Sequence, residues 1–100
     1  MQGANYTYLT DDKIVCQGAS YLYGVILDVS QDGGDVTIYE GQDKNSGRII
    51  AKFAGLGSVT KPYNLPIKLY CQRGIFADVG ANVTGITVIW SRPEPEFVPD

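Results

Sequence analysis

Short runs in which apolar and polar residues alternate recur along the chain, and such runs indicate β-strands. Residues 35–40 place Val36 and Ile38 at alternate positions, and residues 48–54 alternate in the same way. Because side chains on a strand point alternately to its two faces, each run presents one apolar face. Residues 41–47 between them are rich in Gly, Asn and Ser, which suits a longer hairpin loop. An isolated hairpin cannot bury its apolar face, so the rest of the chain is expected to cover it.

The longest apolar run, residues 20–29, is apolar on both of its faces. Strict alternation places Leu22 and Ile26 on one face, and the other face then carries Tyr21, Tyr23, Val25, Leu27 and Val29. A strand of this kind is either central in the fold or contacts a partner through its second face. We therefore expect self-association or a lattice contact through Leu22 and Ile26. Gly24 indicates a bulge or the close approach of another backbone.

Turn residues separate the runs at spacings of about 8–12 residues, which is typical of an all-β sandwich or barrel. We predict an antiparallel β-sandwich, jelly-roll-like or Ig-like, of seven to eight short strands with extended termini. Residues 1–12 are predicted to form an arm, or a short edge strand at 6–9, residues 13–92 the sandwich domain, and residues 93–100 a Pro-rich tail. The expected core positions are Val25, Val36, Ile38, Phe53, Leu69, Ile86, Val88 and Trp90.

Composition and charge narrow the class of protein. A chain of 100 residues with 44% hydrophobic residues corresponds to one globular domain with a real core. The net charge of −3 and the absence of any Lys/Arg cluster argue against a nucleic-acid partner. No apolar run is long enough to cross a membrane and no secretion leader is visible, so neither a membrane span nor export is expected.

The residue types present also argue against an enzyme. The chain has no His, so Ser-His-Asp and Cys-His arrangements are impossible within one chain. The carboxylates that could serve as an acid/base pair lie in turns, one short strand and the tail, without an apolar setting that would raise a pKa: Glu40, Asp43, Asp78, Glu94 and Glu96. We predict no catalytic residue. Two cysteines are too few for a structural zinc site, and Cys16 and Cys71 are predicted to be buried free thiols.

Residues 28–33 are similar to the first half of a calcium-binding loop. Oxygen-bearing side chains occur at Asp28, Ser30 and Asp32, and a Gly follows. The position that should hold a bidentate Glu is Tyr39, and Asp with Gly is also what a plain hairpin turn requires. A plain turn is the preferred interpretation, and no metal site is predicted.

The order of strands and turns resembles a group of small all-β virion proteins of tailed bacteriophages. The resemblance covers roughly residues 21–90. It lies in Tyr23-Gly24-Val25, Val-Thr-Ile-Tyr-Glu-Gly at 36–41, Ser-Gly at 46–47, Gly-Ile-Phe at 74–76 and Val-Thr-Gly-Ile-Thr-Val-Ile-Trp at 83–90. Glu40 stands where the group usually has Asp, Trp90 where it usually has Tyr, and the Pro-rich tail lies outside the pattern.

The resemblance implies a structural protein of the virion without a cofactor. The expected function is that of a capsid decoration (cement) protein, assembled in the host cytoplasm and bound at the capsid surface to the lattice of the major capsid protein, as a homotrimer. A tail or fibre adaptor subunit and a carbohydrate-binding β-sandwich module with exposed tyrosines are the alternatives. The expected interface residues are Tyr6, Tyr8, Leu22, Ile26, Phe97 and Val98, the last two on a tail that is expected to enter a pocket of an adjacent subunit.

Overall fold

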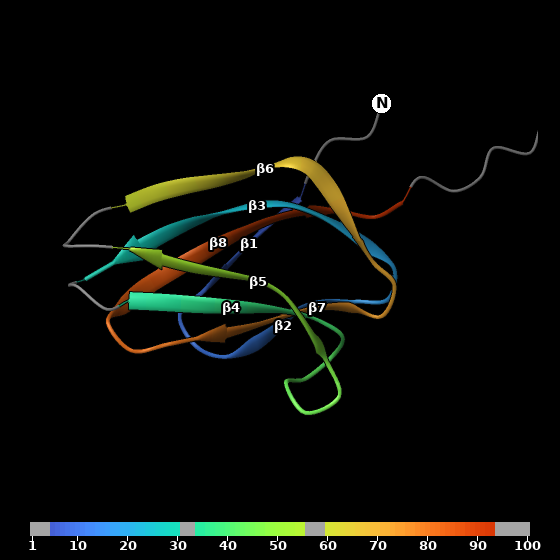
Figure 1. Ribbon diagram of the computed structural model, residues 1–100, viewed down its shortest axis with the longest axis horizontal. Helices are drawn as coiled ribbons and strands as arrows, with labels where there is room; N and C mark the ends of the chain where they lie inside the picture. The colour runs from blue at the N-terminus through green and yellow to red at the C-terminus, as the bar shows by residue number, and fades with distance from the viewer. Residues whose placement is uncertain (1–4, 31–33, 56–59, 94–100) are drawn as a thin grey trace, which may run out of the picture.

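The computed structural model describes residues 5–30, 34–55 and 60–93, and all of its regular elements are β-strands (Figure 1). No helix long and apolar enough to cross a membrane occurs in these ranges. The strands are β1 Asn5–Leu9, β2 Lys13–Gln17, β3 Ser20–Val29, β4 Gly34–Glu40, β5 Arg48–Gly55, β6 Thr60–Cys71, β7 Gly74–Val79 and β8 Val83–Ser91.

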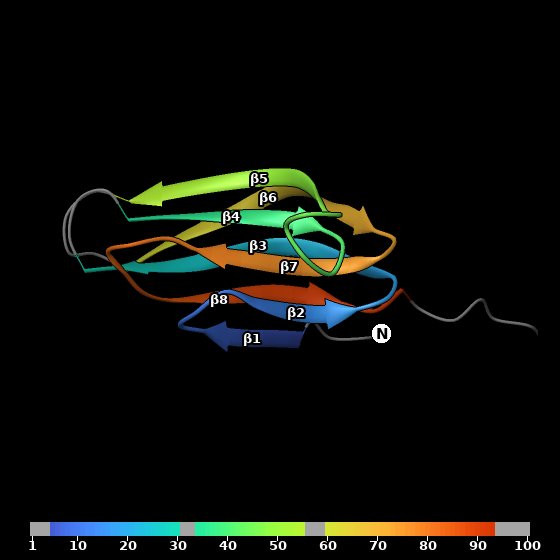
Figure 2. The same cartoon turned by 90° about the horizontal axis from the view of Figure 1, so that it is seen from below.

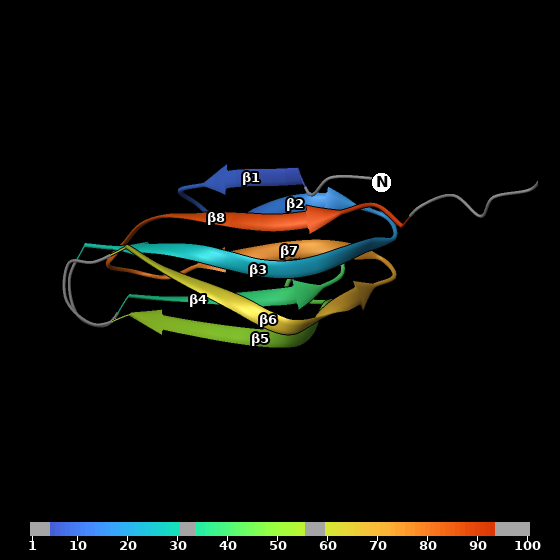
Figure 3. The same cartoon turned by 90° about the horizontal axis from the view of Figure 1, so that it is seen from above.

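The strands form two antiparallel four-stranded sheets that pack face to face, so the predicted β-sandwich is confirmed. One sheet has the order β1-β8-β3-β6 and the other the order β2-β7-β4-β5. Figure 2 shows the second sheet nearest the viewer, and Figure 3 shows the first. Neighbours in a sheet are mostly distant in sequence, as in the pairing of β1 with β8. The sandwich therefore depends on contacts that close long loops.

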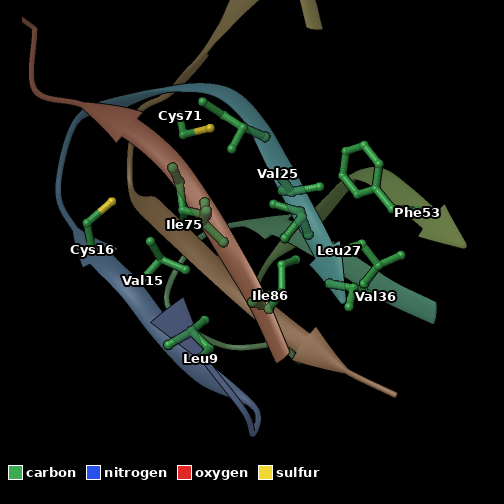
Figure 4. Packing of buried hydrophobic residues seen from close by; sticks show 14 of the residues in the cluster. Leu9, Val15, Cys16, Val25, Leu27, Val36, Phe53, Cys71, Ile75 and Ile86 are labelled. Carbon is green, nitrogen blue, oxygen red and sulfur yellow. The ribbon is translucent and has the colours of Figure 1, made fainter. Parts of the chain in front are cut away.

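The core fills the space between the two sheets (Figure 4). Of the expected core positions, five are at most 1% exposed, Phe53 is 8% exposed, and two pack against the core while partly buried; the five are Val25, Val36, Ile38, Ile86 and Val88, and the two are Leu69 and Trp90. Each such aliphatic side chain contributes about 1.5–3 kcal/mol when it leaves water.

Both cysteines lie in this core as free thiols, as predicted. The Cys16 thiol donates a hydrogen bond to the buried hydroxyl oxygen of Ser20, at 3.3 Å. Burial raises the pKa of the Cys71 thiol to about 11, so this thiol stays protonated at neutral pH.

The prediction that Leu22 shares the outer face of β3 with Ile26 is wrong. Leu22 is fully buried, and so are Val25 and Leu27, while Ile26 is only partly buried. The pairing of β3 with both of its neighbours shifts register between Leu22 and Gly24. Such a bulge inserts one extra residue, so it reverses the parity of every later position. Gly24 thus marks the predicted irregularity, and that irregularity returns Leu22 to the core.

The N-terminal residues of the domain form one of the two structures predicted for them. Asn5–Leu9 is an edge strand paired with β8, which corresponds to the second of the two predictions for this region. Residues 1–4 and 94–100 lie outside the described residues, and the latter include the expected interface residues Phe97 and Val98. β1 begins and β8 ends at the same end of the sandwich, on the right in Figure 1.

Candidate functional site

The outer face of the β1-β8-β3-β6 sheet carries an unusual concentration of tyrosine. Register places Tyr6 opposite Ile89, and Tyr8 in one row with Thr87 and Ile26. We call this surface the tyrosine face and define it by the outward side chains of Tyr6, Tyr8, Tyr21, Ile26, Tyr70 and Ile89. Exposure is 77% for Tyr6 and 55% for both Tyr8 and Tyr70. Exposed tyrosines grouped on one sheet face are more typical of contact surfaces than of general protein surface.

Local contacts hold part of this face in a fixed arrangement. The rings of Tyr21 and Tyr70 lie 5.5 Å apart between centroids, and the Lys68 ammonium lies 4.3 Å from the Tyr21 centroid. At the β1 edge, Tyr8 covers Gly85, because a Cβ at Gly85 would overlap the Tyr8 ring. The face therefore offers aromatic surface with few charged groups, which suits binding to another protein surface or to sugar rings.

The outer face of the other sheet is crossed by the β4–β5 loop, residues 41–47. Lys44 in this loop bonds Asp12 at 3.1 Å and lies 3.7 Å from Asp78 on β7, so the loop extends across the sheet (Figure 2). The Asp43 carboxylate accepts hydrogen bonds from the Ser46 N–H and hydroxyl and from the Asn45 N–H, and these lower the pKa of Asp43. The two sheets thus differ, since the tyrosine face has no comparable loop across it among the described residues.

Asp12 and Asp78 form an acidic pair next to Lys44. Burial raises the pKa of Asp12, but the Lys44 side chain and the Val79 N–H outweigh burial, and the pKa is lowered. Burial and the neighbouring Asp12 raise the pKa of Asp78. Because the Lys44 ammonium lies between the two carboxylates, the pair holds the β4–β5 loop against the sheet.

A pocket of about 400 Å³ opens beside the turn between β6 and β7. It is lined by Glu40, Arg48, Ile50, Tyr70, Gln72 and Arg73. The Arg73 guanidinium bonds the Glu40 carboxylate at 3.1 Å and the Ser46 carbonyl at 3.1 Å, while the Arg73 N–H donates to Glu40 at 2.8 Å. These contacts lower the pKa of Glu40, through the Arg73 side chain first and its N–H second. We call this site the arginine pocket.

The arginine pocket could not be read from the sequence. Arg48 and Arg73 are isolated cations far apart in the chain. They meet because Glu40 pairs with Arg48 on β5 and with Ile75 on β7. The information that brings the two arginines together therefore lies in the pairing of strands that are distant in the sequence.

The remaining predicted site residues give no assembled site. The Asp28 carboxylate accepts a hydrogen bond from the Thr60 hydroxyl at 3.1 Å, and the Ser30 N–H donates to the Asn82 carbonyl at 2.9 Å. Asp32 lies outside the described residues. Within residues 5–30, 34–55 and 60–93, no group of three potential metal ligands occurs.

A scan against models of known protein families, a search of curated proteins and a search of solved structures each find no match to this chain.

Proposed function

We propose that the protein is a non-enzymatic structural protein of a phage virion, a capsid decoration protein that stabilises the head by bridging capsid subunits. The observation that carries the proposal is the tyrosine face, with Tyr6, Tyr8 and Tyr70 each more than half exposed on one sheet. Tyrosine combines a large apolar ring with a hydroxyl, so it tolerates water in the free protein and contributes strongly when a partner covers it. The assignment to a phage capsid rests on the resemblance of residues 21–90 to small virion proteins.

The proposed partner is the lattice of the major capsid protein, and the proposed form on the lattice is a homotrimer. In the trimer, the part of the tyrosine face around Ile26 joins the copies, and the rest of the face is presented several times to the repeating lattice. Several simultaneous contacts raise the overall affinity without making any one contact strong. A sandwich with one uncovered sheet face suits this arrangement, because the loop-covered sheet can face outward while the tyrosine face is buried.

The experiment measures occupancy on purified particles of the phage that encodes the chain. A decoration protein is expected at a copy number comparable to that of the capsid protein, whereas a tail adaptor is expected only at the few copies of a tail ring. The double variant Tyr6→Ser/Tyr8→Ser should fold and yet bind stripped capsids at least about tenfold more weakly, since each buried ring contributes a large apolar area.

The matched control is Ile49→Ser, which removes a side chain that is 51% exposed on the other sheet. This variant should bind like the wild type. Equal binding by the tyrosine variant, or a copy number typical of a tail ring, would refute the capsid proposal.

A carbohydrate-binding module is the second candidate, and the exposed rings of Tyr6 and Tyr8 are the observation that favours it. Aromatic rings on a sheet face can stack on sugar rings. Specific hits on a glycan array that disappear in Tyr6→Ser/Tyr8→Ser would favour this module over the capsid protein.

A further inference from the structure

The arginine pocket lies at the end of the sandwich where β8 delivers the chain to residues 94–100. The Arg92 side chain donates hydrogen bonds to the carbonyls of Gln17 and Ala19, and so fixes the end of β8 against the β2–β3 turn. In that turn the Gly18 N–H donates to the Arg73 carbonyl at 3.2 Å. Hydrogen bonds thus connect the end of β8 through the β2–β3 turn to Arg73 of the pocket. β8 ends at the same end of the sandwich as β4 and β6, on the right in Figure 1.

The lining of the pocket combines apolar side chains with cations. Ile50 and Tyr70 supply carbon surface, and Arg48 and Arg73 supply positive charge. Arg73 is already bonded to Glu40, but none of the ion pairs among the described residues includes Arg48. The ring of Tyr70 packs against the ring of Tyr21, and the Lys68 ammonium lies over that Tyr21 ring. The volume of about 400 Å³ lies within the range of about 300–1,000 Å³ found for sites that bind small organic groups.

The sequence of residues 93–100, Pro-Glu-Pro-Glu-Phe-Val-Pro-Asp, has the complementary composition. It offers one aromatic and one aliphatic side chain, Phe97 and Val98, between carboxylates at Glu94, Glu96 and Asp100. A Pro-rich segment favours the extended polyproline conformation, which rises about 3.1 Å per residue. The four residues 94–97 can therefore carry Phe97 about 12 Å beyond Pro93. Ser91, Tyr21 and Tyr70 lie in one row across β8, β3 and β6, so Tyr70 is two strand spacings, about 10 Å, from Ser91.

From this placement we infer that the arginine pocket binds the segment 94–100 of its own chain, with Phe97 on Ile50 and Tyr70 and a carboxylate of the segment on Arg48. The sequence alone predicts a pocket on an adjacent subunit. The pocket on the same chain is favoured because a short tether keeps the segment at a millimolar effective concentration, which a neighbouring copy must reach by association. This inference goes beyond the proposed function and does not depend on it.

The test compares the full chain with a chain truncated after Pro93 by ¹H–¹⁵N NMR. The amide signals of residues 48–50 and 70–73 should differ between the two chains, and the difference should persist on dilution to the lowest concentration that gives a spectrum. A synthetic peptide of residues 93–100, added to the truncated chain, should move the same signals toward their positions in the full chain. Higher salt should weaken the peptide binding, because exposed charge pairs are screened.

Variants separate the apolar contribution from the ionic one. In the peptide, Phe97→Ala should weaken binding about tenfold or more, since it removes the one large apolar side chain. In the truncated chain, Arg48→Gln should weaken binding about two- to fivefold, as expected for one exposed ion pair. The matched control is Lys52→Gln, which removes the same charge from an exposed position on the same strand and should leave binding unchanged.

Three results would overturn the inference. They are identical pocket signals in the two chains, peptide-induced shifts confined to another face, and a pocket signal in the full chain that reverts on dilution. The last result would assign the pocket to the segment of a second copy. None of these results depends on capsid binding, so the inference and the proposed function can fail separately.

Discussion

Gly24 lies where the backbones of β3 and β6 come into direct contact. A Cβ at this position would overlap the carbonyl oxygen of Tyr63 and come within 3.2 Å of the Asn64 Cα. Backbone atoms of a paired strand cannot move aside as a side-chain tip can. The close approach that the sequence predicts at Gly24 is therefore confirmed, and the same residue shows why Leu22 was misplaced, because alternation rules carry no information about an extra residue in a strand.

We predict that Gly24→Ala lowers the free energy of unfolding by about 1–3 kcal/mol, the usual effect of forcing additional atoms into a packed region. Gly85→Ala is the control, because the atoms that its Cβ would meet belong to Tyr8, whose side chain is 55% exposed and can rotate away. Urea unfolding of the two variants measures the difference. Equal losses of stability would mean that the β3–β6 contact is looser than the structure indicates.

At the scale of elements, the β6 edge strand shows how context changes the effect of proline. Proline ordinarily interrupts a strand, whereas β6 runs from Thr60 to Cys71 with Pro62 and Pro66 inside it. β6 pairs only with β3, and an edge strand tolerates a residue without an N–H. The pairing of β6 with β3 is nevertheless irregular near Pro66, because Leu22 pairs with Leu69 and Gly24 pairs with Asn64. Alternation places Leu69 and Cys71 toward the core, but Ile67 of the same parity is 71% exposed, and no local pattern predicts the edge position.

The Glu40–Arg73 pair connects the end of β4 to the turn before β7, and it gives the stability of the fold an acid-sensitive component. The pKa of Glu40 is lower in the folded protein than in the unfolded chain. The stabilisation is therefore fully present above the unfolded pKa of about 4.3, and it is lost as the pH falls through the lower folded value.

We predict that Glu40→Gln lowers the melting temperature by a few degrees at neutral pH. The effect should become smaller as the pH falls below the unfolded pKa of Glu40, about 4.3, and through its lower folded pKa. Asp11→Asn is the control, because Asp11 is exposed and forms no ion pair with another described residue. Thermal unfolding followed by circular dichroism across this pH range measures both variants. A deficit in Glu40→Gln that stays constant down to low pH would contradict the ionic origin of the effect.

For the whole molecule, the outer faces of the two sheets differ, and local sequence patterns predict the strands but not the pairings that create this difference. Strand positions and most core residues follow from alternation, as Val36, Ile38 and Val88 illustrate. The order β1-β8-β3-β6 requires pairings between residues at opposite ends of the chain, such as Tyr6 with Ile89, and no local pattern specifies them. The tyrosine face and the arginine pocket both arise from such pairings, which is why their members lie scattered in the sequence.

The last prediction concerns self-association through the tyrosine face. The bulge at Gly24 assigns Leu22 to the core and leaves Ile26 in the outer row with Tyr8 and Thr87. Leu22→Ser should therefore lower the free energy of unfolding by about 2–5 kcal/mol, since it removes a fully buried leucine and buries a hydroxyl. Ile26→Ser should instead preserve the fold and weaken the oligomer that we propose, because it removes apolar area from the face alone.

Sedimentation velocity of the wild type, Ile26→Ser and Tyr8→Ser, together with thermal unfolding of all variants, makes the distinction. The wild type should sediment as an oligomer that dissociates on dilution, and both face variants should dissociate at higher concentrations with unchanged melting of the monomer. A wild type that is monomeric at every concentration would refute self-association in solution. The tyrosine face would then be available to the capsid lattice alone, and its contribution would have to be measured on particles.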